Sequence, residues 1–351
     1  MSANAPHAPD PAGPVPLLDV RGLAVEYRIG RRVPPLRAVD GVDLTIGPRE
    51  TVGLVGESGS GKSTVGRAIL GLTPVGEGSI AFDGADITRA DQRTRRKLSA
   101  DLQVVFQDPY SSLNVTRTVG QTLGETLRVH EKASRAEVGA QVRAMLQKVG
   151  LPAEAASRYP AQFSGGQRQR IAIARALMVS PRLVICDEAV SALDLSVQAQ
   201  VLNLLRDLQQ ELQMSYLFIA HDLAVVRHVS QRIVVLYRGR VMEQGDARTV
   251  CEQPAHPYTR ALLMAAPVPD PDLQRSRRLA RAAAPPRSPG ALAAASCPFA
   301  PRCPHAVAVC RSARPPLEAT PAGSLVACHR WRELRESPER DLTITTEARA
   351  G

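Results

Sequence analysis

The chain has 351 residues, 44% of them hydrophobic, and a formal net charge of +10. This length and apolar content predict one large packed domain with an appendage, and they exclude a disordered polymer. Aromatic residues make up only 3% of the chain, which argues against a surface that stacks nucleic-acid bases. No window approaches the run of about 18 apolar residues that a spanning helix needs, so any translocation path has to come from other subunits.

The N-terminal residues 1–16 have neither a basic start nor an apolar core. They predict a flexible leader rather than a secretion signal, and the chain is expected to stay in the cytoplasm. Thiols are mostly reduced there, so the six cysteines are expected to be buried, reactive or metal-binding rather than disulfide-bonded. The arginine-rich segments 89–97 and 275–287 indicate solvated faces or linkers.

The hydrophobic pattern changes along the chain. Residues 17–44 alternate between apolar and polar, which predicts antiparallel strands. Residues 108–178 have a helical period and interrupt an α/β pattern, and the composition after about residue 250 shifts to Pro, Ala and Arg, which indicates a separate C-terminal module. Short apolar runs predict buried parallel strands at Val52–Val55, Leu183–Cys186, Tyr216–Ala220 and Ile233–Leu236.

A glycine-rich loop follows the first of these strands. Residues 56–63 read Gly-Glu-Ser-Gly-Ser-Gly-Lys-Ser and fit the phosphate-loop pattern G-x-x-x-x-G-K-[ST] between a strand and a helix. The glycines allow the backbone to point N–H groups at phosphate, and the following helix adds its positive N-terminal dipole. We therefore expect Lys62 to contact the β- and γ-phosphates of ATP and Ser63 to bind Mg²⁺.

Two acids end the strand predicted at 183–186. Asp187 and Glu188 form the arrangement that can hold a hydrated Mg²⁺ and polarise an attacking water. We expect Asp187 to take the metal and Glu188 the water. Acids at a strand end are often plain surface residues, so this interpretation depends on the other motifs.

A second glycine-rich helix start follows at Ser164-Gly165-Gly166-Gln167. The first turn of a helix has free N–H groups, so this start is a second anion site. One phosphate site per nucleotide would suffice for binding within a single chain. The second site indicates that two chains face each other and that each caps the ATP of the other.

Five further segments accompany these motifs, namely Phe106–Asn114, Arg158–Pro160, Ser191–Asp194, Phe218–Val226 and His256–Leu262. With them, residues 17–335 resemble the family of ABC transporter ATPases, and within it the ATPase subunits of oligopeptide and dipeptide importers, especially the F-type subunit. The resemblance implies an α/β fold, with a P-loop NTPase core on a mostly parallel sheet, an antiparallel β subdomain, a helical insertion and a small cysteine-containing C-terminal module.

The resemblance also implies roles for single residues. Gln107 resembles the residue that senses Mg²⁺ and water, in a loop that meets the membrane subunit. Asp194 resembles the acid that communicates across the dimer, and His221 resembles the histidine that contacts the γ-phosphate. Tyr27 takes the position of an aromatic residue that stacks on adenine. The implied nucleotide site comprises Tyr27, Gly56, Glu57, Ser58, Gly59, Ser60, Gly61, Lys62, Ser63, Thr64, Ser164, Gly165, Gly166, Gln167 and Asp194. The implied catalytic residues are Glu188, His221, Gln107 and Lys62. The implied Mg²⁺ ligands are Ser63, Gln107 and Asp187.

Two positions depart from the family pattern. Ala189 follows the catalytic acid where the family usually has proline, and Val115 replaces another usual proline. Neither change removes a ligand. Proline restricts its own backbone and that of its predecessor, so we expect looser loops beside the site and an effect on the rate of hydrolysis rather than on hydrolysis itself.

Four of the six cysteines, Cys297, Cys303, Cys310 and Cys328, lie near the C-terminus. Their spacing is not a standard zinc pairing and does not by itself define a metal. The segments 297–304 and 327–329 are similar to the tail of peptide-importer ATPases, some of which hold a [4Fe–4S] cluster. The resemblance implies such a cluster on these four thiolates, with zinc and unliganded structural thiols as alternatives.

The resemblance implies a division of the chain into a leader at 1–16, an ABC ATPase domain at 17–250 with a helical subdomain at about 108–178, an oligopeptide-importer C-terminal domain at 251–335, and a tail at 336–351. The implied partners are a second ABC ATPase subunit, two membrane permease subunits and an extracytoplasmic peptide-binding protein, with no nucleic acid. The expected ATPase pair is a heterodimer, and the sequence leaves a homodimer of this chain as the alternative.

We expect a peripheral subunit at the cytoplasmic face of the cell membrane that hydrolyses ATP to energise import of oligopeptides or dipeptides. The same role for nickel or another small solute is an alternative, because other subunits choose the cargo. A soluble ABC ATPase that acts on ribosomes or DNA is a further alternative. Such proteins commonly carry two fused cassettes or a long coiled-coil insertion, and this sequence shows neither.

Overall fold

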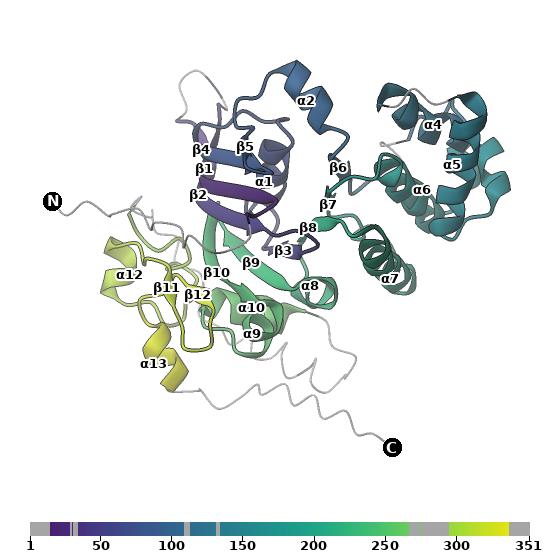
Figure 1. Cartoon of the computed structure of the whole chain (residues 1–351). Helices are drawn as coiled ribbons and strands as arrows, with labels where there is room; N and C mark the ends of the chain where they lie inside the picture. The colour runs from purple at the N-terminus through teal and green to yellow at the C-terminus, as the bar shows by residue number, and fades with distance from the viewer. Residues whose placement is uncertain are drawn as a thin grey trace.

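The computed structural model of the chain describes residues 15–28, 30, 34–108, 113–130, 134–266, 275 and 295–336. The predicted leader and tail therefore lie almost wholly outside the described residues, as do 109–112 and most of 275–287. Figure 1 shows two sheets, a cluster of helices beyond one end of the larger sheet, and the C-terminal elements beyond its other end. In the described part of the chain, no helix is both long enough and apolar enough to cross a bilayer.

The smaller sheet is antiparallel, and its strand order is β2-β1-β4-β5. Its buried side chains form one hydrophobic cluster with the first helix of the core and one face of the larger sheet. The antiparallel strands expected at 17–44 are thus confirmed, whereas the sequence analysis did not predict the last two strands. The bounds are β1 (Leu18–Tyr27), β2 (Leu36–Ile46), β4 (Glu77–Phe82) and β5 (Ala85–Asp86).

The larger sheet has the strand order β11-β12-β10-β9-β3-β8-β7-β6. The five strands from β9 to β6 run parallel, and they are almost wholly buried because side chains cover both faces of the sheet. The α/β fold class with a mostly parallel core is confirmed. The bounds are β3 (Thr51–Val55), β6 (Leu102–Val105), β7 (Leu183–Asp187), β8 (Ser215–Ala220), β9 (Arg232–Tyr237), β10 (Arg240–Asp246), β11 (Glu318–Ala319) and β12 (Leu325–Val326).

Helices connect the strands, and most of them begin at a side chain that accepts from free N–H groups. Asp91, Ser134, Ser164, Asp194 and Asp222 each cap a helix in this way. The bounds are α1 (Lys62–Ile69), α2 (Gln92–Leu98), α4 (Val119–His130), α5 (Arg135–Lys148), η1 (Ala153–Ser157), η2 (Pro160–Gln162), α6 (Gly165–Leu177), α7 (Leu195–Leu212), α8 (Leu223–Val229), α9 (Ala247–Glu252), α10 (Pro257–Ala265), α12 (Ala308–Ser312) and α13 (Trp331–Glu336).

The C-terminal region continues the larger sheet. Strand β12 pairs antiparallel with β10, with Val326 opposite Glu243, and β11 pairs with β12. The sequence analysis expected a separate module after about residue 250, because it used a change in composition and could not detect pairing between distant strands. Main-chain hydrogen bonds thus join the region to the core, and its division from the ATPase domain stays a prediction.

Candidate functional site

The phosphate loop joins β3 to α1, and two glycines determine its course. Gly59 and Gly61 have φ values of 76° and 102°, in the left-handed region where a glycine has no steric penalty. A Cβ at Gly61 would lie 2.4 Å from the carbonyl oxygen of Ala38, and a Cβ at Gly56 would lie 2.1 Å from that of Leu236. Glycine is therefore required both for the turn and for the close approach of neighbouring backbone.

Lys62 is the first residue of α1 and folds back over the loop. Its side chain is only 4% exposed, and its Nζ donates to the carbonyl oxygens of Gly56 and Glu57 at 2.8 and 2.9 Å. Burial lowers the pKa of the Lys62 ammonium, while the carboxylates of Glu188, Asp187 and Glu57 oppose that shift. The amine thus lies inside the loop, where it can exchange carbonyl oxygens for phosphate oxygens.

The acid pair lies at the carboxyl end of β7, beside the phosphate loop. The Ser63 hydroxyl donates to Oδ1 of Asp187 at 2.8 Å, so the two predicted Mg²⁺ ligands are neighbours. Hydroxyl and carboxylate oxygens suit Mg²⁺, which binds proteins through one or two such groups and takes its other ligands from water and phosphate. The donors present therefore fit the ion.

Glu188 has an unusual backbone. Its φ is 49°, a left-handed conformation that is costly for a residue with a side chain. Its N–H donates to the carbonyl oxygen of Ile219 at 2.9 Å, and its own carbonyl accepts from the N–H and hydroxyl of Ser191. These bonds hold the backbone of Glu188 just past the strand end, next to the predicted Mg²⁺ ligand Asp187.

Three further predicted residues lie at the ends of strands, two of them at the larger sheet and one at the smaller sheet. Gln107 and His221 come after β6 and β8 and are exposed. Because parallel strands end at one edge of a sheet, these residues share an edge with Asp187. Tyr27, at the end of β1, donates its hydroxyl to Oγ1 of Thr64 at 3.4 Å, which places its ring beside the first turn of α1.

The second glycine-rich start belongs to a different part of the molecule. Ser164 caps α6, and with Gln167 it forms a capping box in which each side chain accepts from the N–H of the other residue. Figure 1 shows α6 among α4 and α5, away from α1 and the phosphate loop. The structure thus confirms the predicted helix start and leaves it open, since a Cβ at Gly165 would meet nothing within 4 Å.

The cap of α7 lies against this second start. Asp194 accepts from the N–H of Val197 at 3.0 Å and from the Ser196 hydroxyl at 2.8 Å. A Cβ at Gly166 would lie 2.4 Å from a methyl group of Val197. The structure therefore brings Asp194 and the Ser164 motif together, and the role of Asp194 across a dimer remains a prediction.

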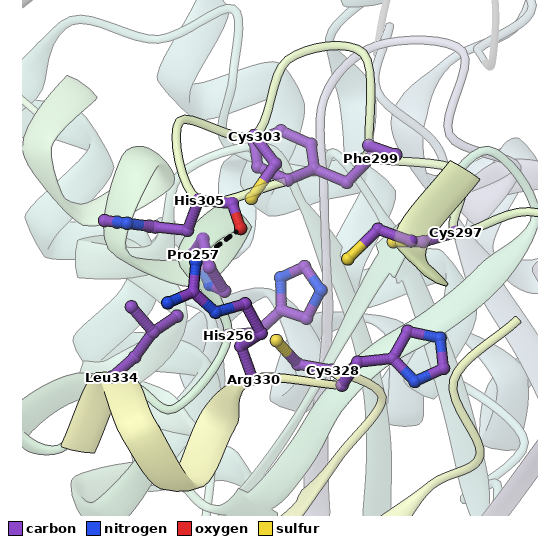
Figure 2. A pocket seen from close by; sticks show the side chains of 12 residues that line it. His256, Pro257, Cys297, Phe299, Cys303, His305, Cys328, Arg330 and Leu334 are labelled. Atoms are coloured by element: carbon purple, nitrogen blue, oxygen red, sulfur yellow. Dashed lines mark hydrogen bonds between the residues drawn. The ribbon is translucent and has the colours of Figure 1, made fainter. Parts of the chain in front are cut away.

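The four C-terminal cysteines line one pocket, together with His256 and Phe299. Figure 2 shows the sulfur atoms of Cys297, Cys303 and Cys328 pointing toward a common space. The pocket has a volume of about 20 Å³, roughly the space that one water molecule needs. Among the described residues, no three His, Cys, Asp or Glu side chains form a group that could hold a metal ion as they stand.

Two residues that contact the phosphate loop were missed by the sequence analysis. Tyr258 and Arg302 both bind Glu57, across separations of 201 and 245 residues. Tyr258 was noted only as part of a family motif. No sequence motif singled out Arg302 as a residue that contacts the loop.

Known proteins resemble the chain over most of its length. The oligopeptide transport ATP-binding protein OppF of Salmonella typhimurium is 47% identical over 312 residues, which are 87% of this chain and 93% of that protein. A putative peptide import ATP-binding protein of Brucella ovis is 46% identical over 316 residues, 90% of this chain and 98% of that protein.

Solved structures show the same fold. A dimeric ATP-binding cassette in a post-hydrolysis state, bound to ADP and Pi, matches with a TM-score of 0.60 and 29% identity over 66% of this chain and 99% of that one. The cbiO1 protein of Clostridium perfringens, part of an ABC transporter complex, matches with a TM-score of 0.62 and 26% identity over 76% and 99%.

A phosphate loop, an acid pair at the end of a neighbouring strand and a second glycine-rich helix start together define an ATP-binding cassette ATPase. The family model for the ABC transporter matches residues 39–191, and the model for the oligopeptide/dipeptide transporter C-terminal region matches residues 242–310. The chain belongs to the ABC transporter family, in the branch that carries this C-terminal region. The family resemblance predicted from the motifs is confirmed.

Proposed function

We propose that this chain hydrolyses ATP to energise the import of oligopeptides or dipeptides through a membrane transporter. The observation that carries the proposal is the likeness over nine-tenths of the chain to ATPases named for peptide import. The C-terminal region characteristic of oligopeptide and dipeptide transporters accompanies the ATP site in the same chain.

In the proposed reaction, a water molecule attacks the γ-phosphorus of ATP and the bond to the bridging oxygen of ADP breaks. Glu188 orients the water and takes up its proton. Lys62 and His221 stabilise the charge on the transferring phosphoryl group. A bound Mg²⁺ adds positive charge beside the phosphates, and Ser63, Asp187 and Gln107 are its proposed protein contacts.

The proposed ATP site is shared between two chains. The start of α6 is open at Gly165 and capped only by its own side chains, so the geometry supports Ser164 of one chain closing on the ATP held by Lys62 of another. The partner proposed is a second, related ATPase subunit in a heterodimer. This arrangement explains why one chain carries two anion sites.

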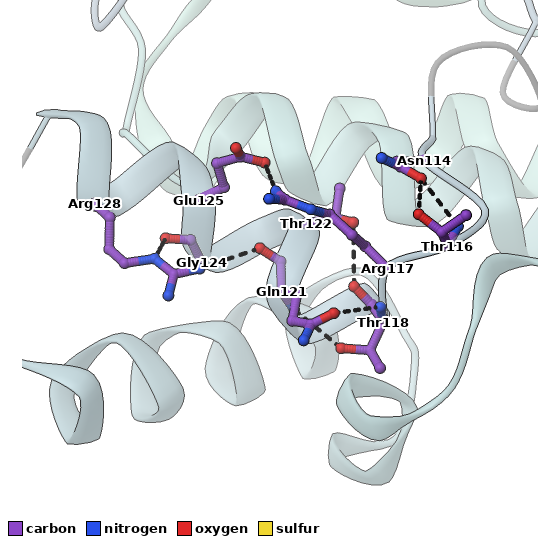
Figure 3. Close-up of polar contacts among 9 residues, drawn as sticks. All are labelled: Asn114, Thr116, Arg117, Thr118, Gln121, Thr122, Gly124, Glu125 and Arg128. Atoms are coloured by element: carbon purple, nitrogen blue, oxygen red, sulfur yellow. Dashed lines mark hydrogen bonds and ion pairs between the residues drawn. The ribbon is translucent and has the colours of Figure 1, made fainter.

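A surface groove next to the Gln107 loop suits a membrane subunit. The groove has a volume of about 360 Å³ and combines polar and apolar side chains from α4, the turn before it and α6. Figure 3 shows two of its lining residues, Arg117 and Glu125, paired with each other, and a third, Asn114, bonded to Thr116. We propose that a permease docks here, which would place the chain on the cytoplasmic face of the membrane and transmit movements of the Gln107 loop.

The test is reconstitution with two permeases, the partner ATPase and an extracytoplasmic binding protein. Peptide-loaded binding protein is expected to stimulate ATP hydrolysis, while binding protein without peptide leaves the rate near its basal level. If nickel or another small solute stimulates hydrolysis and no peptide does, the cargo assignment is wrong and the ATPase assignment stands.

For the cysteine pocket we propose a [4Fe–4S] cluster. Burial raises the pKa of Cys328 to about 12 and that of Cys303 to about 11, so the free thiols are protonated at neutral pH and ligand binding must release protons. A cluster is larger than one ion and its four cysteines bind different irons, so it tolerates sulfur atoms that a single zinc ion would not reach.

Iron and sulfide analysis of protein purified without oxygen tests the cluster. About four irons and four sulfides per chain are expected from the cluster type. Stoichiometric zinc without sulfide would establish the alternative metal, and the absence of iron, sulfide and zinc would leave the cysteines as structural thiols.

A further inference from the structure

Every polar group of Glu57, the second residue of the phosphate loop, takes part in a hydrogen bond. Its N–H donates to the hydroxyl of Tyr258 at 2.9 Å. Its carboxylate accepts two bonds from the Arg302 guanidinium, at 2.6 and 2.8 Å. Its carbonyl oxygen accepts from Nζ of Lys62 at 2.9 Å. The carbonyl oxygen also accepts from the N–H of Ser60 at 3.1 Å. Two of these four groups, from Tyr258 and Arg302, belong to the C-terminal region.

The two residues that reach the loop from the C-terminal region are themselves held firmly. Tyr258 is fully buried, and its ring lies 4.6 Å from that of Tyr237 and 5.3 Å from that of Phe299, measured between centroids. The Arg302 guanidinium lies 5.7 Å from the ring centroids of both Tyr237 and Phe299. Packed aromatic rings have few accessible rotamers, so this support is rigid.

The same aromatic layer borders the cysteine pocket. Phe299 contacts Tyr258 on one side and lines the pocket on the other, where Figure 2 shows it beside Cys303. Arg302 immediately precedes Cys303 in the sequence. One layer of side chains therefore separates the cysteines from the phosphate loop.

The contacts have a consequence for nucleotide binding. Lys62 has to leave the carbonyl oxygens of Gly56 and Glu57 to reach phosphate. Once that bond is broken, the Ser60 N–H still binds Glu57 within the loop, while the contacts of the Glu57 amide and carboxylate tie it to the C-terminal region. A loop already fixed in its binding conformation loses less conformational freedom when the ligand arrives, which increases affinity.

We propose that Arg302 and Tyr258 are positioning residues that hold the phosphate loop open for ATP through Glu57, so that ATP affinity depends on the C-terminal region. The proposal rests on nucleotide binding at this loop, as the proposed function does. Because linkage is reciprocal, bound ATP also stabilises the C-terminal region around Arg302.

The test compares Arg302→Ala, Arg302→Lys and Tyr258→Phe with the parent chain in binding of a fluorescent ATP analogue with Mg²⁺. Arg302→Ala is expected to weaken binding by about fivefold to tenfold, within the usual range of coupling between sites. Arg302→Lys is expected to recover part of this loss, because lysine keeps the charge but cannot make two parallel bonds. In steady-state hydrolysis the loss is expected in KM, with kcat nearly unchanged.

A matched control is Arg332→Ala, which removes another arginine–glutamate pair of the C-terminal region, with Glu318. The Arg332 side chain is 71% exposed and is not bonded to the loop, so its removal is expected to leave affinity at the parental value. A double variant with Glu57→Ala and Arg302→Ala is expected to bind ATP no more weakly than Glu57→Ala alone, because Glu57→Ala already removes the pair.

Hydrogen exchange without nucleotide separates this inference from the proposed function. The Glu57 amide is expected to exchange faster in Tyr258→Phe, and amides 56–61 faster in Arg302→Ala, than in the parent. Parental exchange in both variants, or parental affinity in Arg302→Ala, would overturn the inference. Failure of the parent to bind MgATP would overturn the proposed function and leave the exchange result to decide the positioning role.

Discussion

The two glycine-rich helix starts of this chain differ in how they are supported. The phosphate loop encloses the buried amine of Lys62 and is held by contacts from β2, β9 and the C-terminal region. The start of α6 at Ser164 is exposed and makes its capping bonds within its own first turn. The contacts that support the phosphate loop thus all come from the same chain as the loop. The second has free space where a ligand on another chain would fit, and this difference predicts different results from similar substitutions.

The largest effect is expected from Glu188→Gln, which keeps the shape of the side chain and removes its ability to accept a proton. Hydrolysis is expected to fall by about 10²–10⁴-fold, the usual contribution of a general base. ATP binding is expected to persist, so an ATP-bound dimer should accumulate in size-exclusion chromatography with the partner ATPase. Hydrolysis at the parental rate would contradict the role of Glu188.

An intermediate effect, on the stability of the fold, is expected when the second of the two adjacent glycines at the start of α6 is replaced. In Gly166→Ala the new methyl group meets Val197, and a cost of about 1–3 kcal/mol is expected in the free energy of unfolding, as for other overpacked sites. Adding Val197→Ala should recover most of this loss. Chemical denaturation of the parent chain, Gly166→Ala and the double variant measures both effects.

Gly165→Ala is the matched comparison, because its methyl group points into open space within the chain. Its stability is expected to equal that of the parent or to exceed it slightly, since alanine favours a helix. If this surface faces the ATP of a partner, ATP-dependent dimerisation should nevertheless be lost. Parental dimerisation by Gly165→Ala would show that the second site does not face a nucleotide.

The smallest effect concerns Asp194, which has one observed role and one predicted role. Asp194→Ala removes the cap of α7 and is expected to lower the Tm by about 2 °C. Asp194→Asn retains a capping oxygen and should keep the parental Tm. If Asp194→Asn also hydrolyses ATP normally in the assembled dimer, the residue is only a helix cap.

The sequence predicted the elements that local chemistry determines. The serine at 164 indicated a helix start because a serine hydroxyl accepts from a free N–H group of the first turn, and α6 begins at the next residue. Runs of buried apolar residues predicted β7, β8 and β9 to within one residue at each end. In both cases, residues close in sequence carry the signal.

Contacts between distant segments could not be predicted in this way. The bond from Arg302 to Glu57 spans 245 residues. The residues next to Arg302 in the sequence do not indicate whether its side chain faces solvent or binds a distant loop. The left-handed backbone at Glu188 is likewise imposed by its bonds to Ile219 and Ser191 rather than by residue type. The sequence predicted the members of the proposed nucleotide site, and tertiary contacts determine how these residues are held.

The pairing of β12 with β10 has a practical consequence for anyone who shortens the chain. A truncated cassette that stops soon after β10 would leave the main-chain groups that Glu243 and Gln244 use in this ladder open to strands of other molecules, and exposed strand edges promote aggregation. The same cut would remove the tyrosine hydroxyl that accepts from the Glu57 amide. Such a fragment would therefore be a poor reporter of the protein's solubility and of its nucleotide chemistry, however complete its sequence motifs are.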